Sequence, residues 1–566
     1  MANHDADERA PLLGTARRTS LPEPNLQSLH ASSSQSISSR IRHLAHRAAH
    51  LTTAERAVLV TFASIFVVEI ALGTSTPAVS SMIESIVCRQ RYGDTVLVGH
   101  GGSAIDPRCK APDVQGRLSR VLGWQASFEC LPQILFSLPY GILADNLGRR
   151  PIMLIAWTGL GLQLAWYLIV FYFRETFPLW ALWFAALWGS IGSFQSVGPA
   201  MVFTVLADVT PQAARATCYF RLTAVFLVAE LISNPLAGAL LLWGGNWLPL
   251  VFGFVAIIVS GLILIALPET LHFDTALGKV VPREAAAVGP ADNTAPAKRG
   301  IASAWHSFVH LLRTDARATS LFILRNRPLM FLMIPFIFSI VGRFVQSLLL
   351  QYATKRYSWS WSQAAFLLTI RSTTNLCLCL VLLPLASAAL ARNTSLARAA
   401  GTAGSALRKD LWLARVSGSL LVIGAILIAF AVTPALLSVA LVVFSLGGGY
   451  SSVMRSILNA FVEPHHLAML NTLLGLLEFS GLMVAAPSLF AALQRGVDLG
   501  GVWTGLPFLI CAGMCLMSTL VVVVFRFPAS MLEKEKEEVE RAERAAAAVS
   551  EGEAGAAGAD AEETDV

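Results

Sequence analysis

Twelve apolar segments, each close to the length of a membrane span, constrain the fold of this chain more than any other feature. A helix needs about 20 residues to cross a hydrocarbon core of about 30 Å. Lipid cannot hydrogen-bond to the backbone, so we expect each segment to be helical. The expected spans are 57–80, 121–143, 152–173, 179–205, 217–243, 247–267, 329–350, 364–389, 411–430, 435–452, 467–490 and 503–525.

The composition agrees with a chain that lies mostly in lipid. Only 14% of the residues are charged, whereas soluble domains carry about 25%. The formal net charge is +6, and the basic residues lie mainly in loops beside apolar helices. Attraction to the inner leaflet explains that placement, so we predict the lipid bilayer and not nucleic acid as the partner of these charges.

The basic residues also predict the orientation. The loops after the second, fourth, sixth, eighth and tenth helices contain Lys or Arg, whereas most of the opposite loops have almost none. Cytoplasmic loops are enriched in these residues, so we expect both termini to be cytoplasmic. The first external loop is an exception, because it is basic from Arg89 to Arg120.

A long polar stretch divides the predicted helices into six and six. The predicted organisation is a disordered cytoplasmic tail (1–55), an N-terminal six-helix half (56–267), a cytoplasmic linker (268–328), a C-terminal six-helix half (329–526) and a charged, acidic cytoplasmic tail (527–566). Secondary transporters are often built from such internal repeats. The predicted fold class is therefore an all-α integral membrane protein with two six-helix halves.

One motif follows the second helix and carries most of the functional information. It reads Gly141-Ile142-Leu143-Ala144-Asp145-Asn146-Leu147-Gly148-Arg149-Arg150-Pro151. It resembles the signature of the major facilitator superfamily, in which Gly, Asp, Gly and a basic pair recur at this spacing. Gly141 and Gly148 permit a tight turn and close helix approach. We expect Asp145 to pair with Arg149 and to face a helix N-terminus of the other half, closing a cytoplasmic gate.

Other segments support or qualify this resemblance. Pro268-Glu269-Thr270-Leu271 and the turn from Ala207 to Arg215 are similar to family patterns. The fourth helix lacks the Arg that many proton-coupled members carry, and Asn234–Gly238 holds only a fragment of the pattern of drug/proton antiporters, which weakens a multidrug-efflux interpretation. The Cys88…Cys109 loop with Gln115 resembles the folate- and solute-cotransporter-like branch and its fungal relatives.

Ionisable residues inside predicted spans are the candidate functional residues, because each costs about 2.5–3.5 kcal/mol at mid-bilayer. The resemblance implies that helices one, five, seven, eight and eleven line a central cavity. Proton-coupling candidates are Glu69 and Glu230. Substrate-binding candidates are Arg343, Arg371, Glu478, Gln195, Gln346 and Asn375, with Asn471 as a further polar neighbour. The alternative is structural pairing of these charges, for example Glu478 with Arg343 or Arg371.

Two short features lie outside the predicted spans. Cys88 and Cys109 are predicted to form a disulfide on the non-cytoplasmic face, where such bonds persist. Closing this loop would stabilise the fold by about 3 kcal/mol. Glu8, Leu12 and Leu13 resemble an acidic dileucine signal read by sorting adaptors, which favours a vacuolar membrane, with the plasma membrane as the alternative.

The predicted function is secondary active transport of a small organic solute, coupled to protons as in a symporter, by rocking of the two halves. A guanidinium ligand would suit an anionic solute. The alternative is a non-transporting membrane sensor with the same fold that signals through its tails. We predict a monomer without enzymatic activity, cofactor or metal: His465 and His466 lack ligand partners at useful spacing, and no phosphate-binding loop is present.

Overall fold

The computed structural model describes residues 52–96, 106–271, 273–274, 279–280, 327–339, 341–382, 384–385, 406–459, 461 and 467–526. The sorting candidates Glu8, Leu12 and Leu13, most of the predicted linker and the acidic tail lie outside these residues. Within the helices, the side chains of Asp145, Arg343 and Gln346 also lie outside the described part.

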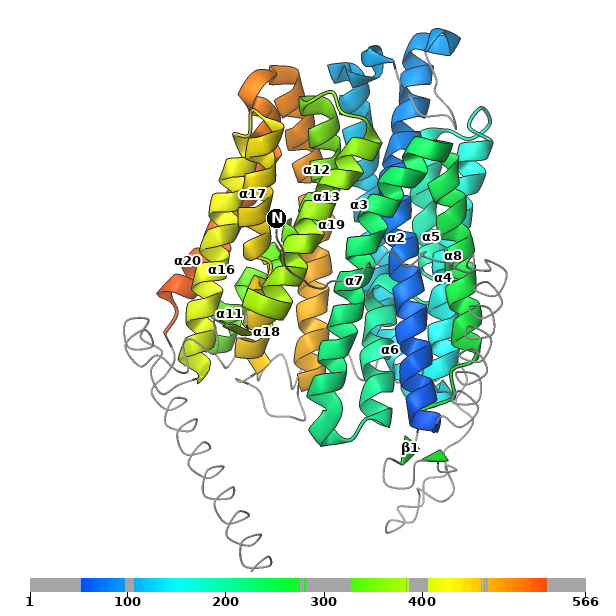
Figure 1. Cartoon of the computed structure of the whole chain (residues 1–566), viewed down its shortest axis with the longest axis vertical. Coiled ribbons are helices and arrows are strands. Elements are labelled where there is room, and N and C mark those ends of the chain that lie inside the picture. Colours follow the sequence, from blue (N-terminus) through cyan, green and yellow to red (C-terminus); the bar gives the residue numbers. More distant parts are fainter. Residues whose placement is uncertain are drawn as a thin grey trace, which may run out of the picture. The chain divides into compact units, whose positions relative to one another are not determined.

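The helices before residue 266, here called the N half, follow one another up and down (Figure 1). They are α2 (Thr53–Tyr92), α3 (Pro112–Leu147), α4 (Arg149–Tyr172), α5 (Ala185–Gly189), α6 (Phe194–Val209), α7 (Gln212–Gly244) and α8 (Trp247–Ile265). Short 3₁₀ turns accompany them: η1 (Gly93–Thr95), η3 (Pro107–Lys110) and η4 (Leu179–Phe184). A two-residue antiparallel ribbon follows, in which β1 (Phe273–Asp274) pairs with β2 (Lys279–Val280), Phe273 opposite Val280.

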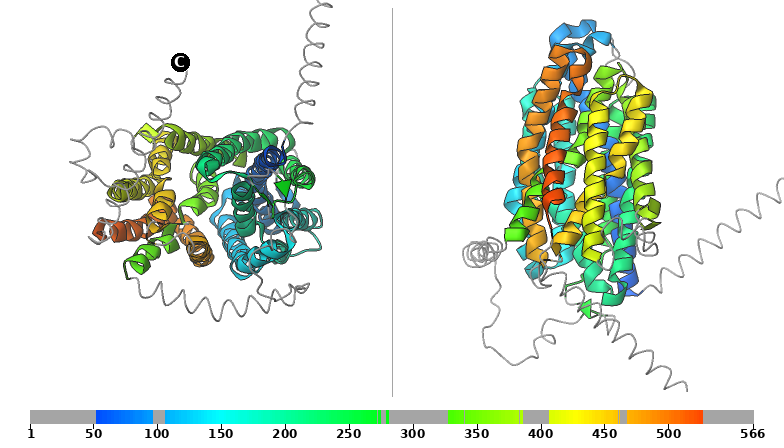
Figure 2. Two further views of the ribbon diagram at one scale, coloured as in Figure 1. Left: turned by 90° about the horizontal axis from the view of Figure 1, so that it is seen from below. Right: turned by 90° about the vertical axis from the view of Figure 1, so that its left-hand side faces the viewer.

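The helices after residue 326 form the C half. They are α11 (Arg327–Ser339), α12 (Val341–Arg356), α13 (Trp361–Cys377), α16 (Ala406–Ala429), α17 (Pro434–Leu446), α18 (Tyr450–Asn459), α19 (Leu467–Leu499) and α20 (Leu506–Val524). A π-helical turn, η5 (Leu378–Leu382), extends α13, and a 3₁₀ turn, η7 (Gly501–Gly505), precedes α20. The left panel of Figure 2 shows the helices of both halves end-on.

Among the described residues, ten helical stretches are long and apolar enough to cross a membrane. The other two predicted spans correspond to α3, which carries several charged side chains, and to the consecutive shorter helices α11 and α12. The prediction of an all-α membrane fold is confirmed. Large apolar side chains remain exposed on many helices, Trp243 and Leu262 among them, as expected where helices face lipid.

Several predicted boundaries are wrong. The helices α2 and α3 extend to Tyr92 and back to Pro112, so much of the predicted first external loop is helical. Cys88 therefore lies in a helix, and only Cys109 lies in a turn. Arg455, which follows the predicted span 435–452, lies in α18. Apolar length alone made these helices too short, because helices continue beyond the hydrocarbon core wherever their polar residues find partners.

The fourth predicted span is interrupted where it approaches α4 closely. Ser193 and Gly192 have positive φ angles of 43° and 78°. A Cβ at Gly192 would lie 2.4 Å from Cα of Ala156 on α4, so the backbones touch there. Glycine permits both the backbone conformation and the contact. The break turns the first helical turn of α6, and with it Gln195, toward the interior between the halves.

The two halves meet through α3 against α19 and through α7 against α13. Two ends of the molecule are named here by their residues. The disulfide end contains Cys88, Cys109 and the start of α3, and the motif end contains Gly148, Arg149 and the start of α4. Contacts between the halves lie toward the disulfide end: Ser127 donates to the carbonyl of Met483 at 2.8 Å, and Ser362 to that of Gly238 at 2.8 Å.

Candidate functional site

A cavity of about 1450 Å³ lies between the two halves. Its lining comes from α2, α3, α4 and α6 of the N half and from α18 and α19 of the C half, with single residues from other elements. It extends from the middle of α2 and α3 to Arg149 and Ala207 at the motif end. Ligand pockets for small organic molecules occupy about 300–1,000 Å³, so this cavity is large enough to hold one.

A carboxylate, Glu129 on α3, lies on the N-half wall of the cavity. Its Oε1 accepts hydrogen bonds from the Tyr167 hydroxyl, from Gln163 Nε2 at 3.1 Å and from Gln125 Nε2 at 3.4 Å. Gln125 and Glu129 are one turn apart on α3, whereas Gln163 and Tyr167 are one turn apart on α4, so two helix faces meet at this point. In the described part of the chain, no Lys or Arg is within ion-pair distance of Glu129.

The C-half wall of the cavity carries an ion pair. Arg455 Nη2 donates to Glu478 Oε1 at 2.8 Å, and the Arg455 guanidinium lies 5.6 Å from the centre of the Phe336 ring. Asn471 donates to the Asn459 side chain at 3.2 Å beside them. The proposed pairing of Glu478 with Arg371 is therefore corrected: the described partner of Glu478 is Arg455, on a helix that extends beyond the predicted span 435–452. The pairing with Arg343 stays a prediction, because that side chain lies outside the described residues.

A second ion pair joins the halves outside the cavity. Arg371 Nη1 on α13 lies 3.3 Å from Glu230 Oε1 on α7, and both side chains are mostly buried. Asn234 donates to the Ser372 hydroxyl at 2.7 Å one turn away. Neither Glu230 nor Arg371 is among the described residues that line the cavity. The expectation that helices five and eight both present charges to the cavity is corrected in this conformation, because these two charges face each other instead.

Glu269, from the Pro-Glu-Thr segment, explains the turn at the motif end. Its carboxylate accepts from the backbone N–H of Arg149 at 2.8 Å and of Arg150 at 3.3 Å, at the N-terminus of α4. An anion is favoured there by the unpaired amides and the helix dipole. Gly148 has a φ of 110°, and a Cβ on it would lie 2.4 Å from Glu269 Oε2. The Arg149 side chain pairs with Asp208 at 3.4 Å, and the expected Asp145 pairing lies outside the described side chains.

We expect Glu269→Ala to destabilise the protein by about 1–2 kcal/mol, because the first amides of α4 lose their acceptor. The measurement is the melting temperature of the purified protein in detergent. The control is Glu175→Ala, which alters an exposed carboxylate in the turn after α4. An unchanged melting temperature in Glu269→Ala would show that the carboxylate does not cap the helix.

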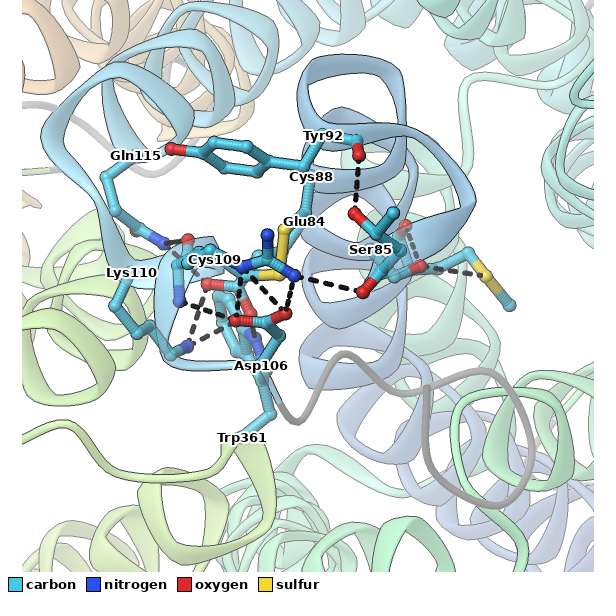
Figure 3. Close-up of a disulfide and its surroundings, with 12 residues drawn as sticks. Glu84, Ser85, Cys88, Tyr92, Asp106, Cys109, Lys110, Gln115 and Trp361 are labelled. Carbon is cyan, nitrogen blue, oxygen red and sulfur yellow. Dashed lines mark hydrogen bonds and ion pairs between the residues drawn. A yellow bond between two sulfur atoms is a disulfide. The ribbon is translucent and has the colours of Figure 1, made fainter. Parts of the chain in front are cut away.

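The remaining predicted site residues are divided between the cavity and its surroundings. Gly141 and Gln195 line the cavity, as does Asn471. Glu69 is half-buried on α2, and Asn375 lies beside Gly448; the described lining includes neither. Arg150 Nη2 donates to the carbonyl of Ile265 at 2.7 Å. Cys88 and Cys109, the pair predicted to be joined, are bonded (Figure 3).

Glu129 is not among the site residues predicted from the sequence, although it lies within the predicted span 121–143. Its depth was therefore readable from the same apolar pattern that singled out Glu230. The carboxylate Glu84 was missed for a different reason. It lies beyond residue 80, where the first span was ended, and its surroundings become buried only because α2 continues for three more turns.

Comparison with known proteins agrees with this architecture. A family model described as the Major Facilitator Superfamily matches residues 61–486. The chain belongs to the major facilitator superfamily. This superfamily member is 29% identical over 467 residues to "MFS efflux pump atnC" of Emericella nidulans, covering 81% of this chain and 85% of that protein. It is 30% identical over 428 residues to "Efflux pump ustT" of Aspergillus flavus, covering 74% and 78%.

Solved structures resemble the superfamily member in fold. A D-xylose-proton symporter aligns with a TM-score of 0.55 at 14% identity, covering 83% of this chain and 98% of the symporter. The nucleoside transporter NupG aligns with a TM-score of 0.52 at 12% identity, covering 84% of this chain and 100% of that transporter. At these identities the likeness concerns the fold alone. The finer resemblance to the folate- and solute-cotransporter-like branch stays a prediction.

Proposed function

We propose that this chain exports a small organic solute in exchange for protons. The observation that carries the proposal is the cavity between the halves, which extends to the motif end while polar contacts join the halves toward the disulfide end. The positive-inside rule assigns the motif end and both termini to the cytoplasm. The conformation then corresponds to a state that loads solute from the cytoplasm, and the names of the two fungal relatives favour export.

Glu129 is the proposed proton carrier, in place of Glu69 or Glu230. Protonation of Glu230 would break its ion pair with Arg371 in a mostly buried site, which is costly. Protonation of Glu129 removes a charge held only by neutral donors, Tyr167, Gln163 and Gln125. A carboxylate that lines the cavity can also exchange its proton with water there. Glu129 therefore combines access with a low cost of becoming neutral.

Solute recognition is assigned to both walls of the cavity. The N-half wall offers amide and hydroxyl groups beside Glu129, and the C-half wall offers the Arg455–Glu478 pair with Asn459 and Asn471. Such a lining suits a solute that both donates and accepts hydrogen bonds, because unpaired polar groups in a closed cavity would be destabilising. The predicted anion ligands Arg343 and Arg371 are not required for this scheme.

Transport in proteoliposomes separates the proposal from the alternative of a non-transporting sensor. We expect an imposed pH gradient to drive accumulation of at least one member of a panel of small organic solutes. The solute should accumulate on the more acidic side, from which the protons flow. Liposomes without protein and vesicles treated with a protonophore are the controls. If the solute moves in the same direction as the protons, the mechanism is symport and not exchange. Failure of a folded protein to move any solute would favour the sensor.

The membrane that holds the protein, and the role of the N-terminal tail in reaching it, are also proposals. The vacuolar membrane and the plasma membrane both suit an exporter that clears a solute from the cytoplasm. Recruitment of a sorting adaptor by Glu8, Leu12 and Leu13 would choose between them, and these residues precede the described part of the chain.

A further inference from the structure

A buried carboxylate lies beside the disulfide (Figure 3). Glu84 on α2 is 1% exposed, and Cys88 follows it by one helical turn. Lys110 Nζ donates to both carboxylate oxygens, at 2.7 and 3.0 Å, and Gln115 Nε2 donates to one of them. We call Glu84, Cys88, Cys109, Lys110 and Gln115 the disulfide corner. All five belong to the N half.

The C half binds this corner through three polar side chains. Trp361 Nε1, at the start of α13, donates to Glu84 Oε2 at 2.6 Å, and the Trp361 ring lies 5.4 Å from Lys110 Nζ. Lys355 Nζ donates to the carbonyl of Lys110. Gln351 Nε2, on α12, donates to the carbonyl of Gln115 at 3.0 Å. The end of α12 and the start of α13 therefore hold the same few residues that surround the disulfide.

The disulfide fixes the acceptors of these hydrogen bonds. It holds the Cα atoms of Cys88 and Cys109 5.1 Å apart and so ties η3 to α2. Lys110, whose carbonyl and ammonium both take part, is the residue after Cys109. The carbonyl of Cys109 accepts from Gln115 Nε2 at 3.0 Å, which orients that side chain toward Glu84. A corner that is covalently tied in this way presents its acceptors in one arrangement.

We propose that the disulfide corner is the latch that closes the disulfide end, and that reduction of the Cys88–Cys109 bond releases it. A dithiol reductant would supply two electrons and two protons, break the S–S bond and leave two thiols, while the reductant itself becomes a disulfide. The turn with Lys110 is then no longer covalently tied to α2, and the population shifts toward the conformation in which the disulfide end is open. This inference rests on alternating access, which is part of the proposed function.

Hydrogen–deuterium exchange of the full-length purified protein tests the latch without any transport measurement. We expect dithiothreitol to raise amide exchange on the order of tenfold in residues 112–127 and 345–366, the segments joined at the disulfide end. Exchange in α16 and α20, which pack on each other within the C half, is expected to stay constant. The Cys88→Ser/Cys109→Ser variant should reproduce the effect and make the protein insensitive to dithiothreitol.

A matched pair of tryptophan variants tests the inter-half link while the disulfide stays intact. Trp361→Phe removes the indole donor to Glu84 but keeps an aromatic ring beside Lys110. We expect it to raise exchange in the same two segments. Trp359→Phe is the control, because that indole lies in the same connection, packs at a tilt against the Tyr357 ring and has no hydrogen bond to Glu84.

Two results would overturn the latch. One is increased exchange confined to residues 88–111 after reduction, which would mean that the disulfide stabilises its own turn only. The other is equal behaviour of the two tryptophan variants. If the double Ser variant does not fold, Trp361→Phe and the reduced wild-type protein still decide the question. Hydrogen–deuterium exchange requires no solute. A failed transport assay would therefore contradict the proposed function without changing the result of this test of the latch.

Discussion

Glu129→Gln is expected to abolish uphill transport of the solute while exchange of solute for solute continues. The amide has nearly the shape of the carboxylic acid but cannot release a proton, so the coupled step is lost. The carbonyl oxygen of the introduced amide can still accept from Tyr167 and Gln163, which keeps the wall of the cavity intact. We expect accumulation to fall to the level seen without a pH gradient. For one-for-one exchange this is a loss of about tenfold per unit of imposed pH gradient, because one pH unit corresponds to about 1.4 kcal/mol.

Three comparisons make this result specific. Tyr167→Phe removes one neutral donor to Glu129 and should shift the pH at which transport is half-maximal, without abolishing coupling. Glu69→Gln tests one of the two carboxylates that were predicted from the sequence; Glu230 is tested together with Arg371 below, because its single variant is expected to fold poorly. Glu175→Gln, at an exposed position, is the neutral control. If accumulation survives in Glu129→Gln but is lost in Glu69→Gln at equal membrane abundance, the coupling residue is Glu69.

The sequence predicts the helices better than it predicts their contacts. Lipid excludes any unpaired backbone, so an apolar run of about 20 residues has few alternatives to a helix. The same reasoning could not show where a helix ends once its residues leave the hydrocarbon core. The ends of α2 and α18 depended on Glu84 and Arg455 finding partners from other elements, Trp361 and Glu478.

The pairing of charges between helices could not be predicted from the sequence either. Glu230 and Arg371 are separated by 141 residues, and nothing local in the sequence indicates that α7 and α13 cross where both charges lie. The carboxylate of Glu269 illustrates what a motif can and cannot give. The resemblance pointed to the Pro-Glu-Thr segment, but its role at the amides of Arg149 and Arg150 depends on a tertiary approach of the end of α8 to the start of α4.

Breaking the Glu230–Arg371 pair is expected to have a large effect on folding. Replacing either residue alone with Gln leaves the other charge without this partner in a mostly buried site between the halves. Such a change costs about 3–5 kcal/mol, a large part of the stability of a typical protein. We therefore expect both single variants to be strongly depleted among folded, membrane-inserted molecules, as measured by fluorescence-detected size-exclusion chromatography.

The double variant Glu230→Gln/Arg371→Gln distinguishes a structural pair from a transport site. Neutralising both charges removes the penalty, so folded protein should return close to the wild-type amount. If the pair only joins the halves, transport by the double variant should also recover, since the Asn234–Ser372 hydrogen bond still links α7 to α13 at this level. If folded protein recovers but transport does not, Glu230 or Arg371 takes part in proton coupling. In that outcome the pair would have to separate during each cycle, and the role assigned to Glu129 would be contradicted.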